Sequence, residues 1–179
     1  DAKRADIGNT SRRYADLLDV ADAITVNPYM GRDSLDPFLS RADAGVFVLC
    51  RTSNPGGADL QDLELAAGEP LYRRVAALAD LWNEHGNVGL VVGATAPEEL
   101  ETLRAEVPDL PFLVPGVGAQ GGDAEAAVEY GLADGVGLVN SSRGIIFAGE
   151  DAPRDDPDAY FGAAGEAAKR LKGRLNRHR

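Results

Sequence analysis

The chain has 179 residues, 18 of them basic and 29 acidic, which gives a formal net charge of −11 at pH 7. Its length suits a single domain over residues 1–179, and its 44% of apolar residues excludes disordered and collagen-like proteins. The negative charge argues against binding to nucleic acid, which requires neutralisation of phosphates.

Five short apolar runs predict β-strands. Each run is rich in valine or leucine and is apolar at both alternating positions, which is typical of strands that are buried on both faces in a parallel sheet. In chain order the runs are residues 23–26, 45–50, 88–92, 112–117 and 135–139.

Helical patterns lie between these runs. Apolar side chains recur at helical spacing in residues 70–85, where Pro70 stands near the first turn. The next segment, 97–106, begins with proline and carries two acids in its first turn, where the helix dipole favours negative charge. Two further helices are predicted over residues 123–130 and 160–175.

The repeated order of strand and helix predicts an α/β fold with right-handed crossovers. Polar and glycine-rich residues follow all five predicted strands. An open sheet would gather such residues at one switch point, whereas a (β/α)8 barrel places them at the ends of many strands. The pattern therefore favours a TIM barrel.

Five strands are too few to close an eight-stranded barrel, which typically needs about 250 residues. The chain also starts at Asp1 within a dense polar motif. We therefore expect that the upstream strands are missing from this sequence. The chain would then be the C-terminal part of one barrel domain, with about the last five to six βα units.

The sequence contains no run of the ~18 apolar residues that suggests a membrane span. It also has no basic segment followed by an apolar run, so we expect no secretory signal. The lone Cys50 cannot form an intramolecular disulfide, so we expect a cytoplasmic protein without membrane contact. One cysteine and two histidines leave no ligand set for structural zinc. Because Cys50 lies in an apolar run, it is expected to be buried rather than a nucleophile.

The opening residues place two acids close to one lysine. If Asp1 and Lys3 lie at a strand end, the two-residue period points both side chains to the same side. A turn would bring Asp6 back towards Lys3, and two flanking carboxylates would keep the lysine protonated. Such a lysine is a candidate general acid for a developing carbanion. The alternative is a solvated charged loop.

The wider pattern resembles the orotidine 5′-monophosphate decarboxylase family, in its longer bacterial branch. The resemblance begins with Asp-x-Lys-x-x-Asp followed by Ile-Gly-Asn-Thr in residues 1–10. The Thr-Ser-Asn-Pro-Gly loop at 52–56 follows a later strand. Residues 115–122 and 140–144 supply the motifs that follow the last two strands. Together these motifs are highly specific, and they run from Asp1 to about Arg143.

The resemblance implies decarboxylation of orotidine 5′-monophosphate (OMP) to UMP in pyrimidine biosynthesis, with no metal and no organic cofactor. Lys3 would protonate C6 of the pyrimidine, and Asp1 would lie against the departing carboxylate and hold Lys3. Asp6, Ile7 and Thr10 match residues that family members contribute across a dimer interface. The family therefore implies a homodimer.

The resemblance also implies a set of substrate-binding residues. Ser53 would bind the edge of the pyrimidine ring. Gln120 and Arg143 match the phosphate-binding pair, and arginine offers phosphate a planar, bidentate set of donors. The stretch that begins at Gly118 is the candidate lid. The predicted substrate-binding set is Ile7, Thr10, Ser53, Pro115, Gly118, Gln120, Ser142 and Arg143.

Two alternatives stay open from the sequence. Sugar-phosphate decarboxylases and aldolases of the same superfamily share the Asp-x-Lys-x-x-Asp motif, but they use magnesium and an enediolate intermediate. The second alternative is a nucleotide-binding remnant without catalysis. The first lysine of the family's charged network, on the preceding strand, has no counterpart here. An intact enzyme therefore needs residues upstream of Asp1, and we expect a molecule of these residues alone, without the upstream strands, to be poorly folded and almost inactive.

Overall fold

The computed structural model describes residues 1–117, 121–132, 137–153 and 155–179. Five parallel strands form one sheet in the consecutive order β1-β2-β3-β4-β5. The chain also reaches the outer edge of β1 before the first helix, where Arg4 pairs in parallel with Val26. The strands are β1 (Ala23–Val26), β2 (Gly45–Arg51), β3 (Val88–Val92), β4 (Phe112–Pro115) and β5 (Gly137–Asn140).

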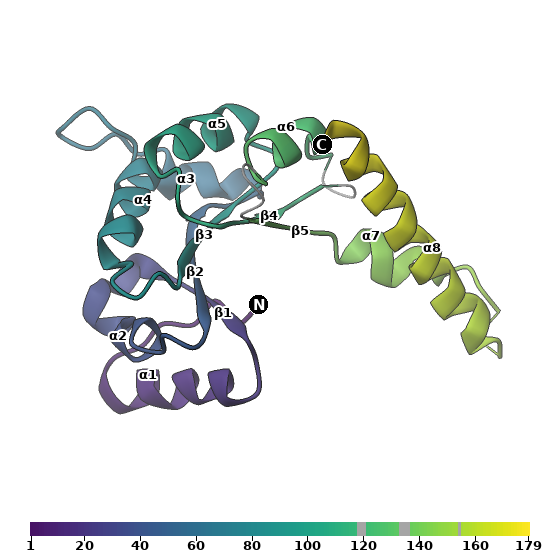
Figure 1. Cartoon of the computed structure of the whole chain (residues 1–179), viewed down its shortest axis with the longest axis horizontal. Helices are drawn as coiled ribbons and strands as arrows, with labels where there is room; N and C mark the ends of the chain where they lie inside the picture. The colour runs from purple at the N-terminus through teal and green to yellow at the C-terminus, as the bar shows by residue number, and fades with distance from the viewer. Residues whose placement is uncertain (118–120, 133–136, 154) are drawn as a thin grey trace.

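The sheet is curved, and the helices that connect its strands lie along its outer side (Figure 1). Strands that follow one another in the chain are also neighbours in the sheet, so the strand order does not reverse. A doubly wound open sheet needs such a reversal. The described strands therefore form part of a barrel wall, and the predicted α/β barrel fold is confirmed.

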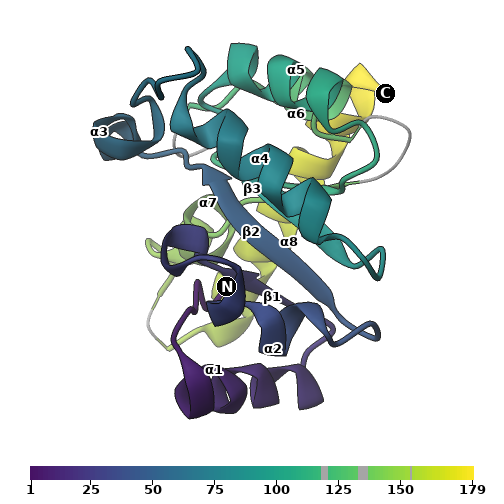
Figure 2. The ribbon, with the colours of Figure 1, turned by 90° about the vertical axis from the view of Figure 1, so that its left-hand side faces the viewer.

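The helices follow local signals in the sequence. Pro97 occupies the first turn of α5, and the Asp123 side chain accepts hydrogen bonds from two backbone N–H groups at the start of α6. Figure 2 shows α4 lying across β2 and β3. The helices are α1 (Gly8–Ala15), α2 (Asp36–Leu39), α3 (Ala58–Gln61), α4 (Leu71–Trp82), α5 (Pro97–Glu106), α6 (Ala124–Glu129), α7 (Arg143–Ile146) and α8 (Pro157–Leu175).

Alternate residues of the strands face two different environments. One set, which includes Val48, Leu90 and Phe112, is fully buried in the main hydrophobic core with α4 and α5. The other set faces the inner side of the curved sheet, where Leu49 and Leu113 line a cavity. Burial of the first set fixes the register of the strands, and the register determines which side chains face inward.

The predicted boundaries agree with the structure in part, and the helix predicted at 70–85 ends already at Trp82. The strands at 23–26 and 88–92 and the helix at 97–106 have the predicted bounds. β4 is two residues shorter than predicted, because Gly116 adopts a φ of +101° and turns the chain out of the sheet. The last helix begins at Pro157, three residues early, because Asp156 caps it through the N–H of Ala159. Two residues of the predicted run 135–139 lie outside the described residues.

The bounds of α1 were not predicted, because its first turn lies within the polar opening motif. That residues 1–179 form a single domain stays a prediction. In the part of the chain that the structure describes, no helix is long and apolar enough to cross a membrane.

Candidate active site

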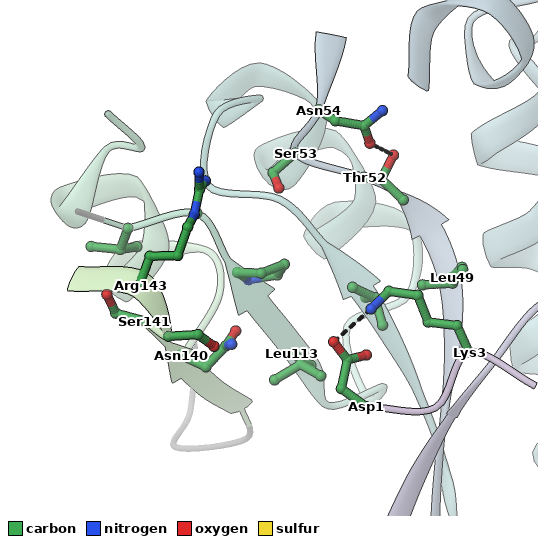
Figure 3. Close-up of a pocket in the computed structure, with 15 residues that line it drawn as sticks. Asp1, Lys3, Leu49, Thr52, Ser53, Asn54, Leu113, Asn140, Ser141 and Arg143 are labelled. Atoms are coloured by element: carbon green, nitrogen blue, oxygen red, sulfur yellow. Dashed lines mark hydrogen bonds and ion pairs between the residues drawn. The ribbon is translucent and has the colours of Figure 1, made fainter. Parts of the chain in front are cut away.

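A cavity of about 630 Å³ lies at the carboxyl ends of the strands, on the inner side of the sheet. This volume is in the range of small-molecule sites. Leu49, Val91 and Leu113 supply an apolar wall. Polar side chains reach the cavity from the opening segment, from the loop that follows β2, and from the end of β5 through the start of α7 (Figure 3). They belong to Asp1, Lys3, Thr52, Ser53, Asn54, Asn140, Ser141, Ser142 and Arg143.

Asp1 and Lys3 form an ion pair in this cavity. Lys3 Nζ lies 2.5 Å from Asp1 Oδ2, and the two side chains are half exposed to solvent. The second Asp1 oxygen, Oδ1, accepts a hydrogen bond of 2.8 Å from the Thr25 hydroxyl. The two predicted residues therefore lie on the same side, although Lys3 has a left-handed φ of +49° and not the extended backbone that the two-residue period assumes. The structure adds Thr25 as their buried partner.

The predicted approach of Asp6 to Lys3 within one chain is wrong. Asp6 Oδ1 accepts a hydrogen bond of 2.7 Å from the backbone N–H of Ile7, at the start of α1. Among the described residues, the only ion-pair partner of Lys3 is Asp1. Asp6 lies just before α1 and is not among the residues that line the cavity.

The loop that carries Ser53 is held by a side chain from α3. Gln61 Oε1 accepts hydrogen bonds from the backbone N–H of Thr52 at 2.9 Å and from Arg51 Nη1 at 3.3 Å. Gln61 Nε2 donates to Thr52 Oγ1, whose hydroxyl in turn donates to Asn54 at 2.8 Å. The same loop also lines a second cavity of about 510 Å³. Ser53 is therefore presented by a loop with defined backbone contacts.

On its other side, this loop packs directly against the end of β3. A side-chain carbon at Gly93 would lie 2.7 Å from Ser53 Cα, closer than real side-chain carbons approach. Thr95 Oγ1 donates a hydrogen bond of 3.0 Å to the carbonyl oxygen of Ser53. Position 93 therefore requires glycine, because the Ser53 backbone occupies the space of a side chain.

We expect Gly93→Ala to lower the free energy of unfolding by about 1–3 kcal/mol, because the added methyl group overfills a packed site. It should also displace Ser53 and so weaken the binding of a ligand in the cavity. Gly165→Ala in α8 is the matched control, since no described atom lies within 4 Å of its added carbon. That control should raise stability by about 0.5–1 kcal/mol. Equal effects of the two substitutions in denaturant unfolding would contradict the packing argument.

Arg143 lies across the cavity from Lys3, at the first residue of α7 (Figure 3). Its side chain is exposed and forms no ion pair with any carboxylate that the structure describes. Ser141 and Ser142 precede it and line the same cavity. A guanidinium group without a protein carboxylate at the cavity edge suits a phosphate ligand.

The predicted site residues fall into three groups. Asp1, Lys3, Ser53, Pro115, Ser142 and Arg143 all line the cavity. Asp6, Ile7 and Thr10 do not, and the Ile7 side chain is exposed at the start of α1. Gly118 and Gln120, with the start of the predicted lid, lie outside the described residues. Sequence reasoning missed Thr25, Gln61 and Gly93, although Thr25 is a polar residue near the end of a predicted strand.

Cys50 is buried, as predicted, and lies on the outer side of β2. Its side chain is 2% exposed, and its thiol donates a hydrogen bond to the carbonyl oxygen of Tyr72. Burial raises the pKa of the Cys50 thiol well above its usual range, so the reactive thiolate is disfavoured. Within residues 1–117, 121–132, 137–153 and 155–179, no group of three or more His, Cys, Asp and Glu side chains is arranged to hold a metal ion.

Polar side chains from the ends of several parallel strands surround one cavity here, which defines an α/β-barrel enzyme. The family model described as "Orotidine 5'-phosphate decarboxylase / HUMPS family" matches residues 1–154. The chain belongs to this family.

Individual relatives agree with the family model. The orotidine 5′-phosphate decarboxylase of Halorubrum lacusprofundi is 76% identical over 186 residues, covering 100% of this chain and 67% of the relative. That of Haloarcula marismortui is 75% identical over 187 residues, covering 100% and 68%. The solved structure of Leishmania donovani OMP decarboxylase matches with a TM-score of 0.78 and 44% identity, covering 98% of this chain and 67% of that one. The chain thus spans about two thirds of the length of these relatives.

These relatives distinguish between the two enzyme types that share the Asp-x-Lys-x-x-Asp motif. Both curated proteins are named orotidine 5′-phosphate decarboxylase, at 76% and 75% identity. The predicted family is therefore confirmed. The predicted activity, that of an orotidine 5′-phosphate decarboxylase and therefore a carboxy-lyase, is confirmed as well. The relatives favour it over the magnesium-dependent sugar-phosphate enzyme.

Proposed function

We propose that the complete protein converts OMP to UMP without a metal or an organic cofactor, and that Lys3 protonates C6 of the pyrimidine. The observation that carries this proposal is the arrangement around the cavity. The Asp1–Lys3 pair lies on one side, and the Arg143 guanidinium lies on the other (Figure 3). A nucleotide that spans the cavity would place its base near Lys3 and its phosphate near Arg143.

The chemistry at Lys3 follows from fixed charges. When the bond between C6 and the carboxyl carbon breaks, CO2 leaves and the bonding electron pair stays on C6. The Lys3 ammonium group is complementary to that carbanion and delivers a proton to it. The Asp1 carboxylate repels the substrate carboxylate but not neutral CO2, so its charge favours the transition state over the ground state.

Ser53 and Arg143 bind parts of the substrate that do not react. The Ser53 hydroxyl would bind the edge of the pyrimidine, on a loop whose position Gln61 and Gly93 fix. Pro115 and Ser142 also line the cavity, and they would contact the bound nucleotide. Binding energy at the phosphate would serve to hold the base against Lys3. Gln120 and Gly118 complete the proposed phosphate site and lid.

The complete protein is proposed to act as a homodimer. Asp6, Ile7 and Thr10 match family residues that enter the partner's site, and their position outside their own chain's cavity is compatible with that role. Ile7 is 61% exposed at the start of α1, so it is free to enter a neighbouring subunit. The cytoplasmic location and the absence of nucleic-acid binding stay predictions.

The test is the ultraviolet absorbance of OMP over time with the complete protein and a metal chelator. We expect the orotidylate signal to disappear at the same rate with and without the chelator. A rate that falls on chelation would support the magnesium-dependent chemistry instead. Binding of UMP without any turnover of OMP would support the non-catalytic alternative.

A further inference from the structure

Thr25 on β1 connects the two residues of the candidate acid pair. Its hydroxyl oxygen accepts a hydrogen bond of 3.0 Å from the backbone N–H of Lys3. The same hydroxyl lies 2.8 Å from Asp1 Oδ1. Thr25 is only 4% exposed, whereas the side chains of Asp1 and Lys3 are 66% and 48% exposed.

The direction of these hydrogen bonds is determined by chemistry. A carboxylate only accepts hydrogen bonds and a backbone N–H only donates them, whereas a hydroxyl does both. The Thr25 hydroxyl therefore donates its single proton to Asp1 and accepts from Lys3. Together with the ion pair, these bonds close a ring from the Lys3 backbone through Thr25 and Asp1 to the Lys3 ammonium group.

The Asp1–Lys3 pair needs such a support. Exposed ion pairs contribute little on their own, because solvent screens them and both side chains lose freedom. Lys3 also has a φ of +49°, a left-handed conformation that is strained for a residue with a side chain. Strained conformations at functional sites persist only where the surrounding structure holds them. The hydrogen bond from the Lys3 N–H to buried Thr25 holds this one.

We propose that Thr25 is a positioning residue for decarboxylation, whose hydroxyl fixes the Lys3 backbone and the Asp1 carboxylate so that the ammonium group points at C6. The inference rests on the proposed role of Lys3. Thr25 does not line the cavity and acts only through its two partners.

Valine is the matched substitution at this position. It has nearly the shape of threonine and favours strands, but it lacks the hydroxyl. The neighbouring backbone bonds, from Arg4 N–H to Thr25 O and from Asn27 N–H to Arg4 O, do not involve the side chain. The segment should therefore stay beside β1 while the ring of side-chain hydrogen bonds is lost.

In the complete protein, we expect Thr25→Val to lower kcat for OMP by about 10- to 100-fold through misplacement of the proton donor. KM should stay within about twofold, since the base and phosphate contacts are unchanged. Thr25→Ser, which keeps the hydroxyl, should restore kcat to within about threefold of the original protein. If Thr25→Val does not fold, Thr25→Ser and Thr25→Ala provide the same comparison, because they differ only by the oxygen atom.

A double variant separates positioning from general packing. If Thr25 acts through Lys3, then Thr25→Val should have no further effect on kcat in a Lys3→Ala background. Equal loss in the valine and serine variants, or an additional loss in the double variant, would overturn the inference. So would an unchanged kcat in Thr25→Val while Lys3→Ala is impaired, an outcome that leaves the proposed function intact. Full activity of Lys3→Ala would overturn both.

Discussion

Replacement of Lys3 by alanine is expected to lower kcat for OMP by about 10²- to 10⁴-fold, the range that a positioned general acid contributes. The ammonium group both delivers the proton and stabilises the carbanion at C6, so its loss acts on the transition state. KM should change much less than kcat. Steady-state decarboxylation by the complete protein measures both quantities.

The matched control for this substitution is Lys169→Ala in α8. Lys169 also forms an ion pair with an acid, with its Nζ 2.7 Å from Glu166 Oε1, but it lies outside the cavity. Its replacement should leave kcat unchanged. If both variants lose activity equally, the effect of Lys3 is one of net charge or folding rather than proton transfer.

Variants of Lys3 and Asp6 also test the proposed homodimer. Lys3→Ala and Asp6→Asn should each have little activity alone. In an equal mixture with exchanging subunits, half of the dimers combine the two variants, and each of these has one intact site. The mixture should therefore regain about a quarter of the original activity, if the sites are shared across a two-fold interface. A mixture that stays inactive after exchange would argue against a role for Asp6 in the partner's site.

The strands were predictable because a strand that is buried on both faces needs an uninterrupted run of apolar residues. The run at 88–92 is apolar throughout, and all five of its residues are buried in the structure. β5 gave a weaker signal, since its residues alternate between half-buried and exposed. Helix starts were predictable where a proline or an acid marks them, as at Pro97 and Asp123.

The supporting contacts of the site were not predictable, because they join positions that are far apart in the sequence. Thr25 is 22 residues from Lys3, and its alignment with Lys3 depends on the pairing of the opening segment with β1. Gly93 requires glycine only because the loop after β2 folds back over the end of β3. For Asp6, in contrast, the sequence suggested a local contact that the structure does not contain. Its charge spacing pointed to Lys3, but the Asp6 side chain accepts a hydrogen bond from the backbone N–H of Ile7 at the start of α1.

Replacement of Arg143 by alanine tests the other side of the cavity. A hydrogen bond to a charged group is worth about 1.5–3 kcal/mol, so kcat/KM for OMP should fall by about 10- to 150-fold. Arg143→Lys should recover part of this loss, since it keeps the charge but not the bidentate geometry. Arg74→Ala in α4 removes the same charge from an exposed position away from the cavity, and it should have no effect.

A substrate without the phosphate isolates the contact that Arg143 makes. For the nucleoside orotidine, the original protein and Arg143→Ala should have the same kcat/KM, because the group that Arg143 binds is absent. An equal loss with both substrates would mean that Arg143 supports the fold or the base instead of the phosphate. If only the nucleotide is affected, the phosphate lies at α7, and the position of Lys3 on the other side of the cavity then places the base against Lys3. The Lys3 and Arg143 substitutions together thus determine the orientation of the substrate.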